Sequence, residues 1–408
     1  MLPNLRHLRL FTAISRHGRL VAAAQELHLT QPAATQAVHG LERWFGAELL
    51  RRSSGGVALT PAGELCRARS ERALAQLHEG AGEALRAPDA GARLERALTA
   101  AQLQALVEVV EQGGFGRAAR HGARSRPGLH RAVRSLERNA GLVLFEPTSY
   151  GLQPSREAGR LVRRARLAAA ELEQARAEVS ASAGGSSGRT VIGAMPLART
   201  WLVPEAVLEF LAAEPRHAVS ILDGPYETLL AALRGGMAEF LVGALRQPGP
   251  GADVVQEPLF DDPLAIVVRS GHPLAGRRRL RNRDLLRYPW VAPRPGSPLR
   301  RQFEALFAGP PAQRWPPIEC NSLVAARALL LGSERMMLLS AHQVRHELRT
   351  GLLVALPHPQ GRVTRPIGLA RRRDWRPTAA QARLLECLRQ RARSLAEGLP
   401  SATRAAIL

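Results

Sequence analysis

The stretch Leu20–Arg43, LVAAAQELHLTQPAATQAVHGLER, decides the fold of the first part of the chain. It predicts two short helices joined by a tight turn, with Thr30 as the N-cap of the second helix. Pro32 stands in the predicted first turn of that helix, where no intrahelical N–H donor is lost. Apolar residues then recur at every third or fourth position, as on the buried face of a helix. They are Ala34, Val38, Leu41 and Phe45.

The other face of the second predicted helix carries short hydrogen-bonding side chains. They are Gln31, Thr35, Gln36, His39 and Arg43. Each base pair shows the major groove a different pattern of donors and acceptors, which side chains of this kind can read. We therefore interpret the pair as a helix-turn-helix whose second member, Gln31–Arg43, reads DNA. The alternative is an ordinary amphipathic helix pair without a ligand.

A predicted two-stranded wing follows over residues 49–59, with its turn at Ser53–Gly56. Arg51 and Arg52 lie in its first strand, and a wing beside a reading helix contacts the DNA backbone. We therefore expect these two side chains to contact phosphates. Thr60-Pro61 then opens a long predicted helix.

The composition bounds the class of protein. A chain of 408 residues predicts several domains, and 57 basic against 35 acidic residues give a net charge of +22, which suits a polyanionic partner. All the basic residues are arginine, so the charge also reflects a composition bias and does not by itself establish nucleic-acid binding. Three widely spaced cysteines predict neither a zinc site nor a disulfide framework. With no signal-peptide pattern and no long apolar run, we expect a cytoplasmic protein without a membrane segment.

The pattern of the first segment starts again after a predicted break at Pro88–Gly91. Residues displaced by 95 positions correspond: Leu8 and Leu103, Gly18 and Gly113, Thr30 and Ser125, Pro32 and Pro127, Val38 and Val133, Leu41 and Leu136, Gly46 and Gly141. We expect one inserted residue in the second wing, because Ala62-Gly63 then meets Ala158-Gly159. The repeat predicts a second winged helix-turn-helix with its own long helix, Glu157–Val179.

The second predicted reading helix carries a different set of candidate DNA contacts. They are Ser125, Arg126, His130, Arg131 and Arg134. The arginines favour phosphate contact. The second wing, however, has Glu146 and Pro147, which repel the DNA backbone and remove a strand donor. Two interpretations stay open: the segment makes an auxiliary DNA contact, or it is a domain used for packing and dimerisation. The residues of the second wing slightly favour the second interpretation.

Beyond a Gly/Ser hinge at Ala183–Gly188, the periodicity changes to alternating β-branched strands and amphipathic helices. Strands are predicted at Thr190–Ala194, Ala218–Leu222 and Glu239–Gly243, with helices at Leu202–Ala213 and Tyr226–Leu233 between them. This order predicts a parallel α/β sheet with helices on its faces.

The first segment resembles the DNA-binding domain of LysR-type transcriptional regulators. The residues that carry the resemblance are Phe11, Ala22-Ala23-Ala24, Leu29-Thr30-Gln31-Pro32-Ala33, Val38, Leu41-Glu42, Phe45-Gly46, Leu49-Leu50-Arg51 and Leu59-Thr60-Pro61-Ala62-Gly63. The resemblance implies a winged helix-turn-helix with Thr30, Pro32 and Ala33 among its DNA contacts. It also implies a linker helix that pairs with its copy, giving a homodimer or homotetramer on double-stranded promoter DNA.

The last part resembles the effector domain of the same family, a two-lobed fold like periplasmic binding proteins. Leu202-Val203-Pro204, Leu229–Gly236, Leu241-Val242-Gly243, Gly271–Ala275 and Tyr288-Pro289-Trp290 carry this resemblance, and Tyr226–Gly243 looks most like the galactose-binding-protein-regulator subgroup. The expected domains are a winged helix-turn-helix (1–63), a linker helix (64–95), a divergent second winged helix-turn-helix (96–156), a second linker helix with the hinge (157–188) and the effector domain (189–398).

Ligands of parallel sheets lie beyond the carboxyl ends of the strands, where helix N-termini point free N–H groups inward. The candidate effector contacts selected on this ground are Pro196, Leu197, Ala198, Arg199, Thr200, Ala244, Leu245, Ser297, Asn321 and Ser322. For Arg199 the alternative is a solvated helix residue, and for Ser297 and Ser322 it is helix capping alone. Cys320 has no histidine beside it, and we expect it to be a buried structural residue.

The predicted function is a ligand-responsive, sequence-specific transcriptional regulator, located with the bacterial nucleoid in the cytoplasm. A small molecule between the lobes would change DNA binding or bending, with a possible RNA polymerase contact. We expect no cofactor, metal or catalytic residue. A transport-type solute-binding protein would fit only the last part of the chain, and an enzyme on the same fold would need an acid–base pair that the sequence does not offer. A sequence-indifferent architectural DNA protein would rely on charge, whereas the Gln31–His39 face is nearly neutral.

Overall fold

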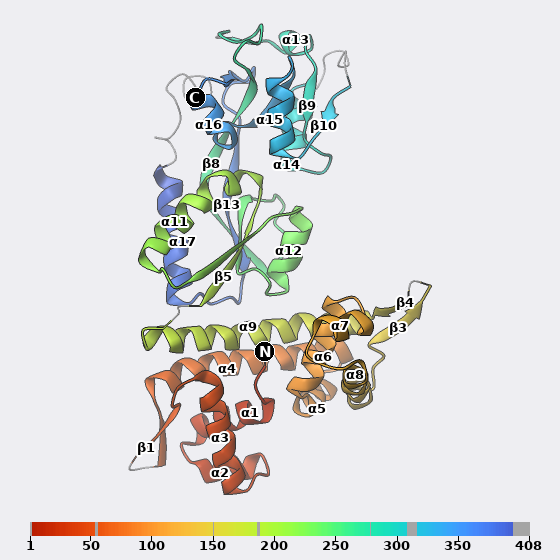
Figure 1. The fold of residues 1–408 in the computed structure, drawn as a ribbon, viewed down its shortest axis with the longest axis vertical. Coiled ribbons are helices and arrows are strands. Elements are labelled where there is room, and N and C mark those ends of the chain that lie inside the picture. The colour runs from red at the N-terminus through yellow and green to blue at the C-terminus, as the bar shows by residue number, and fades with distance from the viewer. Residues whose placement is uncertain are drawn as a thin grey trace. The chain divides into compact units, whose positions relative to one another are not determined.

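The computed structural model describes residues 2–53, 56–149, 151–185, 188–277, 279–307 and 316–394. The predicted wing-turn residues Ser54 and Gly55 and the hinge residues Ser186 and Ser187 lie outside them. The chain divides into two compact units, one made essentially of residues 1–189 and the other of most of residues 190–408. Figure 1 shows the helices and strands of both units.

The first unit begins with three helices: α1 (Leu5–His17), α2 (Leu20–Glu26) and α3 (Gln31–Phe45). The Thr30 hydroxyl accepts the N–H of Ala33 at 3.4 Å, so the predicted N-cap is confirmed. Ala34, Leu41 and Phe45 of the predicted stripe are buried, together with Ala37, whereas Val38 is only partly covered. The predicted helix-turn-helix geometry is therefore present.

The wing consists of β1 (Leu50–Ser53) and β2 (Gly56–Leu59), which are antiparallel. Thr60 then caps the long helix α4 (Pro61–Leu85) by accepting the N–H of Gly63 at 2.9 Å.

The predicted break at Pro88–Gly91 is wrong, because α5 (Pro88–Ala97) forms there. Proline in the first turn starts a new helix as readily as it ends the previous one. The new helix folds back along α4 where Gly91 crosses Gly82, and a Cβ on Gly91 would lie 2.7 Å from the Cα of Gly82.

The following elements repeat the order of the first segment. They are α6 (Ala100–Glu111), α7 (Phe115–His121), α8 (Arg126–Ala140), the antiparallel strands β3 (Phe145–Thr148) and β4 (Gly151–Pro154), and the long helix α9 (Arg156–Ser182).

The two segments also share hydrogen bonds between helix and wing. The Glu42 carboxylate accepts the N–H of Leu49 at 3.0 Å, and Glu137 accepts the N–H of Leu144 at 2.9 Å. Both donors and both acceptors are related by the same displacement of 95 residues, as are the N-caps Thr60 and Ser155. The expected inserted residue in the second wing is therefore absent.

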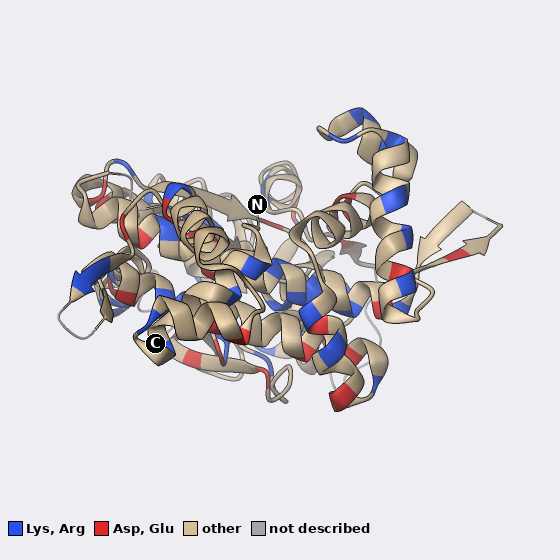
Figure 2. Cartoon of the chain, turned by 90° about the horizontal axis from the view of Figure 1, so that it is seen from below, with Lys and Arg blue, Asp and Glu red and all other residues tan. Residues whose placement is uncertain are grey.

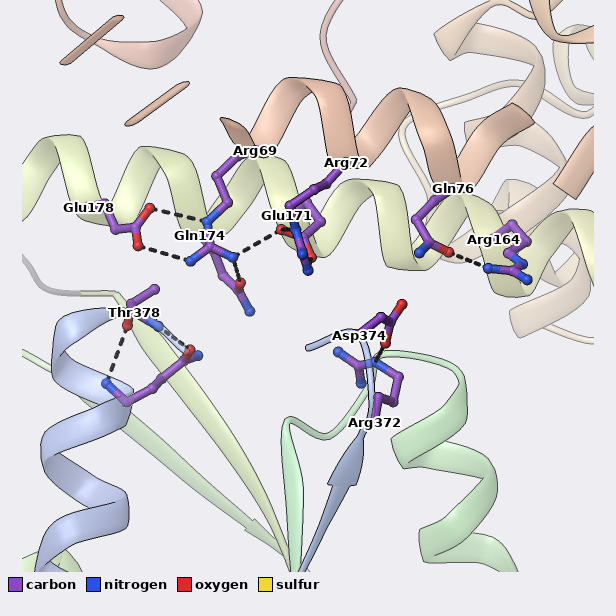
Figure 3. Close-up of polar contacts among 11 residues, drawn as sticks. Arg69, Arg72, Gln76, Arg164, Glu171, Gln174, Glu178, Arg372, Asp374 and Thr378 are labelled. Carbon is purple, nitrogen blue, oxygen red and sulfur yellow. Dashed lines mark hydrogen bonds and ion pairs between the residues drawn. The ribbon is translucent and has the colours of Figure 1, made fainter. Parts of the chain in front are cut away.

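The long helices α4 and α9 pack against each other in antiparallel orientation (Figures 1 and 3). Arg69 near the start of α4 contacts Glu178 near the end of α9, while Glu83 near the end of α4 contacts Arg164 near the start of α9. The linker helix was expected to pair with its copy from a second subunit. In the structure α4 packs against α9 of the same chain, and pairing with a second subunit stays a prediction.

The second unit is built on a mixed sheet, so the predicted parallel sheet is confirmed only in part. The strand order is β10 (Ile318–Glu319), β9 (Trp290–Ala292), β11 (Met336–Ser340), β8 (Val254–Arg269), β13 (Thr364–Arg372), β7 (Phe240–Ala244), β5 (Arg189–Ala194) and β6 (Ala218–Leu222), with β12 (Leu353–Leu356) beside β8. The pairs β5–β7, β9–β11 and β9–β10 are parallel, whereas β8 runs antiparallel to β11, β12 and β13. The described α-helices of this unit are α10 (Pro196–Thr200), α11 (Leu202–Ala213), α12 (Tyr226–Arg234), α13 (Asn282–Leu285), α14 (Pro298–Ala305), α15 (Leu323–Leu331), α16 (Arg345–Arg349) and α17 (Ala379–Arg393). A 3-10 turn, η1 (Ala341–Val344), precedes α16.

The long strand β8 divides this sheet into two lobes. Its first part pairs with β13 in a lobe with β5, β6 and β7, and its last part pairs with β11 and β12 in a lobe with β9 and β10. In the first lobe, alternate residues of each strand face opposite layers: Phe240 and Val242 pack toward α11 and α17, whereas Leu241 packs toward α12. Strands covered on both faces explain the continuous apolar runs of the sequence.

Candidate DNA-reading surface and effector site

The exposed face of α3 holds the side chains that the sequence pattern selected. Gln31, Thr35, Gln36, His39 and Arg43 are all exposed. The Thr35 hydroxyl donates to the Gln31 carbonyl at 3.1 Å, and the His39 ring lies 3.2 Å from the Glu42 carboxylate. This candidate DNA-reading face therefore carries amides, a hydroxyl and an imidazole on a helix whose orientation the buried stripe fixes.

Next to this face, the N-terminal end of α3 and the wing hold the remaining candidates. Thr30 and Pro32 are exposed and Ala33 is partly buried, while Arg51 and Arg52 are exposed on β1. Glu42 connects the two elements, because its carboxylate contacts His39 of α3 and accepts the N–H of Leu49, which precedes β1. The position of the wing is therefore tied to α3.

Ser125, the N-cap of α8, is exposed, as are Arg126, Arg131 and Arg134 on α8, but His130 is not. Its ring stacks on Phe115 with a centroid distance of 3.9 Å and is partly buried. Burial lowers the pKa of His130, and the neighbouring Arg126 and Arg134 lower it further. His130 is therefore less available for DNA contact than the other candidates of this segment, because α7 places Phe115 against it.

Basic residues are spread along the chain between acidic ones (Figure 2). Many arginines have acidic partners, as with Arg134 and Glu137 at 2.9 Å, which correspond to His39 and Glu42 in α3. Net charge alone therefore does not identify a DNA-binding surface. Candidate DNA contacts follow from the position of each side chain.

The candidate effector residues of the first lobe follow two neighbouring parallel strands, β5 and β7. Leu197 and Ala198 have buried side chains, so only Pro196, Arg199 and Thr200 expose side-chain atoms in α10. Arg199 pairs with Asp223 at 2.5 Å, and the Thr200 hydroxyl donates to the Leu197 carbonyl at 2.7 Å.

At the end of β7, Ala244 and Leu245 are partly exposed, and Leu245 donates its N–H to the Pro366 carbonyl at 2.9 Å. The two strand ends thus lie at one edge of the first lobe.

The candidates of the second lobe follow the parallel strands β9 and β10. Ser297 caps α14 by accepting the N–H of Arg300 at 3.1 Å, and Ser322 caps α15 by accepting the N–H of Ala325 at 3.3 Å. Asn321 is exposed beside Ser322. Both serines therefore have the capping role that was the alternative to ligand contact, and capping leaves their hydroxyl oxygens at the helix N-termini.

Cys320 is half-buried, so the expected buried residue is not found there. Its thiol donates to the Ser322 carbonyl at 3.3 Å.

A polar group at the junction of the lobes was not predicted. Asp262 of β8 is fully buried, accepts the Ser340 hydroxyl at 2.6 Å and pairs with Arg365 of β13 at 3.0 Å. Burial raises the pKa of Asp262, while Arg365 and the Ser340 hydrogen bond oppose that shift. Next to it, burial and Arg345 lower the pKa of His342 to about 4. The sequence signal was weak, because these residues come from distant elements.

Contacts also cross directly from one lobe to the other. The His342 ring lies over Trp201 of the first lobe with a centroid distance of 6.1 Å, and Arg345 pairs with Glu205 of α11 at 3.3 Å. A change in the angle between the lobes must break or shift these contacts.

Within the described residues, no cluster of His, Cys, Asp or Glu has the arrangement of a metal site. No helix among them is both long and apolar enough to span a bilayer.

Comparison with known families agrees with this arrangement. The family described as "LysR substrate binding domain" matches residues 183–393, and "Bacterial regulatory helix-turn-helix protein, lysR family" matches residues 5–64 and 100–159. The HTH-type transcriptional regulator GalR of Pseudomonas putida is 33% identical over 390 residues, which cover 95% of this chain and 97% of that relative. PcaQ of Agrobacterium fabrum is 31% identical over 72% of this chain and 96% of its own length.

Solved structures show the same fold. A full-length OxyR from Pseudomonas aeruginosa superposes with a TM-score of 0.54 at 22% identity, covering 76% of this chain and 97% of that one. CbnR, a LysR family transcriptional regulator, superposes with a TM-score of 0.51 at 20% identity, covering 71% of this chain and 98% of that one. A DNA-binding helix-turn-helix joined to a mixed-sheet effector domain defines a ligand-responsive transcriptional regulator. The chain belongs to the LysR family of these regulators.

Proposed function

We propose that α3 and its wing read promoter DNA through the residues that the sequence pattern selected. This proposal is supported by the exposure of Gln31, Thr35 and Gln36 on one face of a helix whose opposite face is buried. Amide side chains can pair with adenine edges, and Arg51 and Arg52 on the wing can contact phosphates. DNA binding places the protein in the cytoplasm with the nucleoid.

We further propose that residues 96–156 form a second, divergent winged helix-turn-helix domain, with 64–95 and 157–188 as linker segments. The repeated element order, the shared 95-residue displacement of the caps and the corresponding Glu42–Leu49 and Glu137–Leu144 hydrogen bonds support it. The alignment with GalR covers 95% of this chain and 97% of that relative, so the two chains have similar lengths.

For residues 189–398 we propose an effector domain that binds a small molecule between its lobes. The strand ends that carry Pro196–Thr200 and Ala244-Leu245 meet at one edge of the first lobe, and those before Ser297 and Ser322 meet in the second. Helix N-termini and hydroxyl groups at these positions suit an anionic or hydrogen-bonding ligand. Binding would change the contacts of Trp201 and Glu205 with His342 and Arg345, and thereby the angle between the lobes.

The test of DNA reading is a binding assay on enriched genomic fragments, comparing wild type with a Gln31/Thr35/Gln36 triple alanine variant. The triple variant should lose the enriched motif and keep its unfolding temperature. If it enriched the same motif with the same affinity, α3 would not be the reading helix. An Arg383→Ala variant is the matched control, because Arg383 makes an exposed ion pair with Glu214 in the second unit.

A further inference from the structure

The α4–α9 contact contains an arginine cluster that joins the two long helices. Arg69 of α4 donates to Glu171 at 2.9 Å, to Gln174 at 2.7 Å and to Glu178 at 2.9 Å, all on α9 (Figure 3). Its side chain is only 7% exposed. A buried guanidinium with this set of acceptors holds the two helices in one register.

A second cluster stands further along the same contact. Arg164 of α9 donates to Gln76 of α4 at 2.7 Å, pairs with Glu79 at 2.5 Å and contacts Glu83. Every member is displaced by 95 residues from a member of the first cluster: Arg69 and Arg164, Gln76 and Glu171, Glu79 and Gln174, Glu83 and Glu178. Each of the two helices thus makes the same set of contacts to the other. This reciprocity is the property of an isologous, two-fold dimer interface, here within one chain.

Further contacts favour the unlike pair over two copies of one helix. Arg72 pairs with Glu171 at 2.6 Å, and Arg163 pairs with Glu83 at 2.8 Å. Two copies of α4 would place Arg72 opposite Gln76, the counterpart of Glu171, and would have Ala68 in place of Arg163. Both of these ion pairs would be lost.

The interface is also closely filled. A Cβ on Gly80 of α4 would lie 2.7 Å from the Cβ of Arg164, so the backbones approach here at a distance that only glycine allows. The counterpart of Gly80 in α9 is Ala175, which carries the Cβ that this approach excludes. A second α9 could not replace α4 without a shift of the helices.

The two segments that these helices join carry different reading faces. In the repeat, Gln31 corresponds to Arg126, Thr35 to the partly buried His130, and Gln36 to Arg131. Amides pair with adenine, whereas arginine pairs with guanine or phosphate, so the two faces select different bases.

We propose that one chain is a self-contained dimer of DNA-reading segments, which binds a site of two unlike half-sites, one read by α3 and the other by α8. The proposal rests on the proposed function of α3 and goes beyond it. Contacts between copies then use surfaces other than the paired faces of α4 and α9, and the number of half-sites bound is twice the number of chains.

The first experiment selects binding sites from random duplex DNA with the full-length chain. Three variants are compared with wild type: Gln31/Thr35/Gln36→Ala, Arg126/Arg131/Arg134→Ala and the control Arg383→Ala. Wild type and the control should enrich two unlike half-sites at fixed spacing, and each triple variant should lose a different one. Exchanging one half-site for a copy of the other should weaken wild-type binding by about ten-fold or more.

The outcomes separate this inference from the proposed function. If wild type enriches no motif, the proposed function of α3 fails. If it enriches a palindrome that the α3 variant loses entirely, α3 helices of two chains read it, and the self-contained dimer is overturned. A single half-site unaffected by the α8 variant overturns it as well.

The second experiment asks whether the pairing is within one chain. One variant carries Arg69→Glu, another carries Glu171→Arg with Glu178→Arg, and a third carries all three changes. If α4 pairs with α9 of the same chain, a mixture of the first two variants should remain defective in DNA binding, whereas the third variant should recover DNA binding. Recovery in the mixture would show exchange between chains and overturn the proposal. If the third variant does not fold, the mass of the wild-type complex with its selected site still tests the proposal. One chain is expected for each pair of half-sites, and two chains would refute the self-contained dimer.

Discussion

Arg69→Met tests the energetic weight of the α4–α9 pairing. The substitution keeps much of the aliphatic volume of Arg69 and removes the guanidinium that contacts Glu171, Gln174 and Glu178. Breaking a buried ion pair by removing one partner costs about 3–5 kcal/mol, because the other charge stays buried without compensation. Glu171 keeps Arg72, and the Glu178 side chain is 19% exposed, so we expect the lower end, about 3 kcal/mol.

The matched control is Arg67→Ala on the same helix. Arg67 pairs with Glu64 and Glu71 on the surface, where such pairs contribute about 0–1 kcal/mol. Arg164→Met, the counterpart in the repeat, should resemble Arg69→Met and not the control.

Hydrogen exchange is the appropriate assay, since the chain has more than one unit and amide protection reports on α4 and α9 separately from the second unit. Amide protection in α4 and α9 should fall in Arg69→Met and remain in Arg67→Ala, while the strands of the second unit keep theirs. Equal protection in the two variants would refute the assigned weight of this cluster.

Three further outcomes are expected. Gln31→Ala should weaken binding to the selected site by about 1–3 kcal/mol and relax base preference at one position, and unchanged affinity and preference would contradict direct reading by this side chain. Arg51→Ala should weaken binding to all DNA alike and reduce the slope of log K against log salt by about 1, so an unaltered slope in a salt titration would exclude a phosphate contact. Burial and Arg345 lower the pKa of His342 from 6.5 to about 4, so the unfolded chain takes up the proton first. The resulting stability is present above pH 6.5 and is lost as the pH falls toward 4, of the order of 3 kcal/mol. A thermal-unfolding series should show this loss for wild type and a flatter profile for His342→Phe, and identical profiles would contradict it.

Local chemistry explains why much of the fold could be predicted. Thr30, Thr60, Ser125 and Ser322 each accept the backbone N–H that an N-cap residue is expected to accept, and the helices begin where these residues predict. The buried stripe of α3 follows from helical periodicity in the same direct way.

Long-range contacts could not be predicted in this way. Whether α4 pairs with its copy or with α9 depends on contacts about a hundred residues apart in sequence, and the apolar pattern of the helix is the same in both cases. The antiparallel course of β8 was missed because strand direction leaves no mark on an apolar run such as Leu264–Val268. The burial of His130 depended on Phe115, which only the packing of α7 on α8 brings close.

The candidate site was predictable to different degrees in the two units. The exposed face of α3 follows from the same periodicity that gives its buried face. The polar group of Asp262, Ser340 and Arg365 at the junction of the lobes joins strands that the sequence keeps far apart. No spacing rule connects these residues.

The repeat by 95 residues also affects how such a regulator can change over generations. In a homodimer, one codon specifies both reading helices, and any substitution alters both halves of every target site at once. Here α3 and α8 are encoded separately, while Arg69 and Arg164 keep the two segments together. If α3 and α8 each read DNA as proposed, one half of the recognised sequence can drift while the other stays under selection.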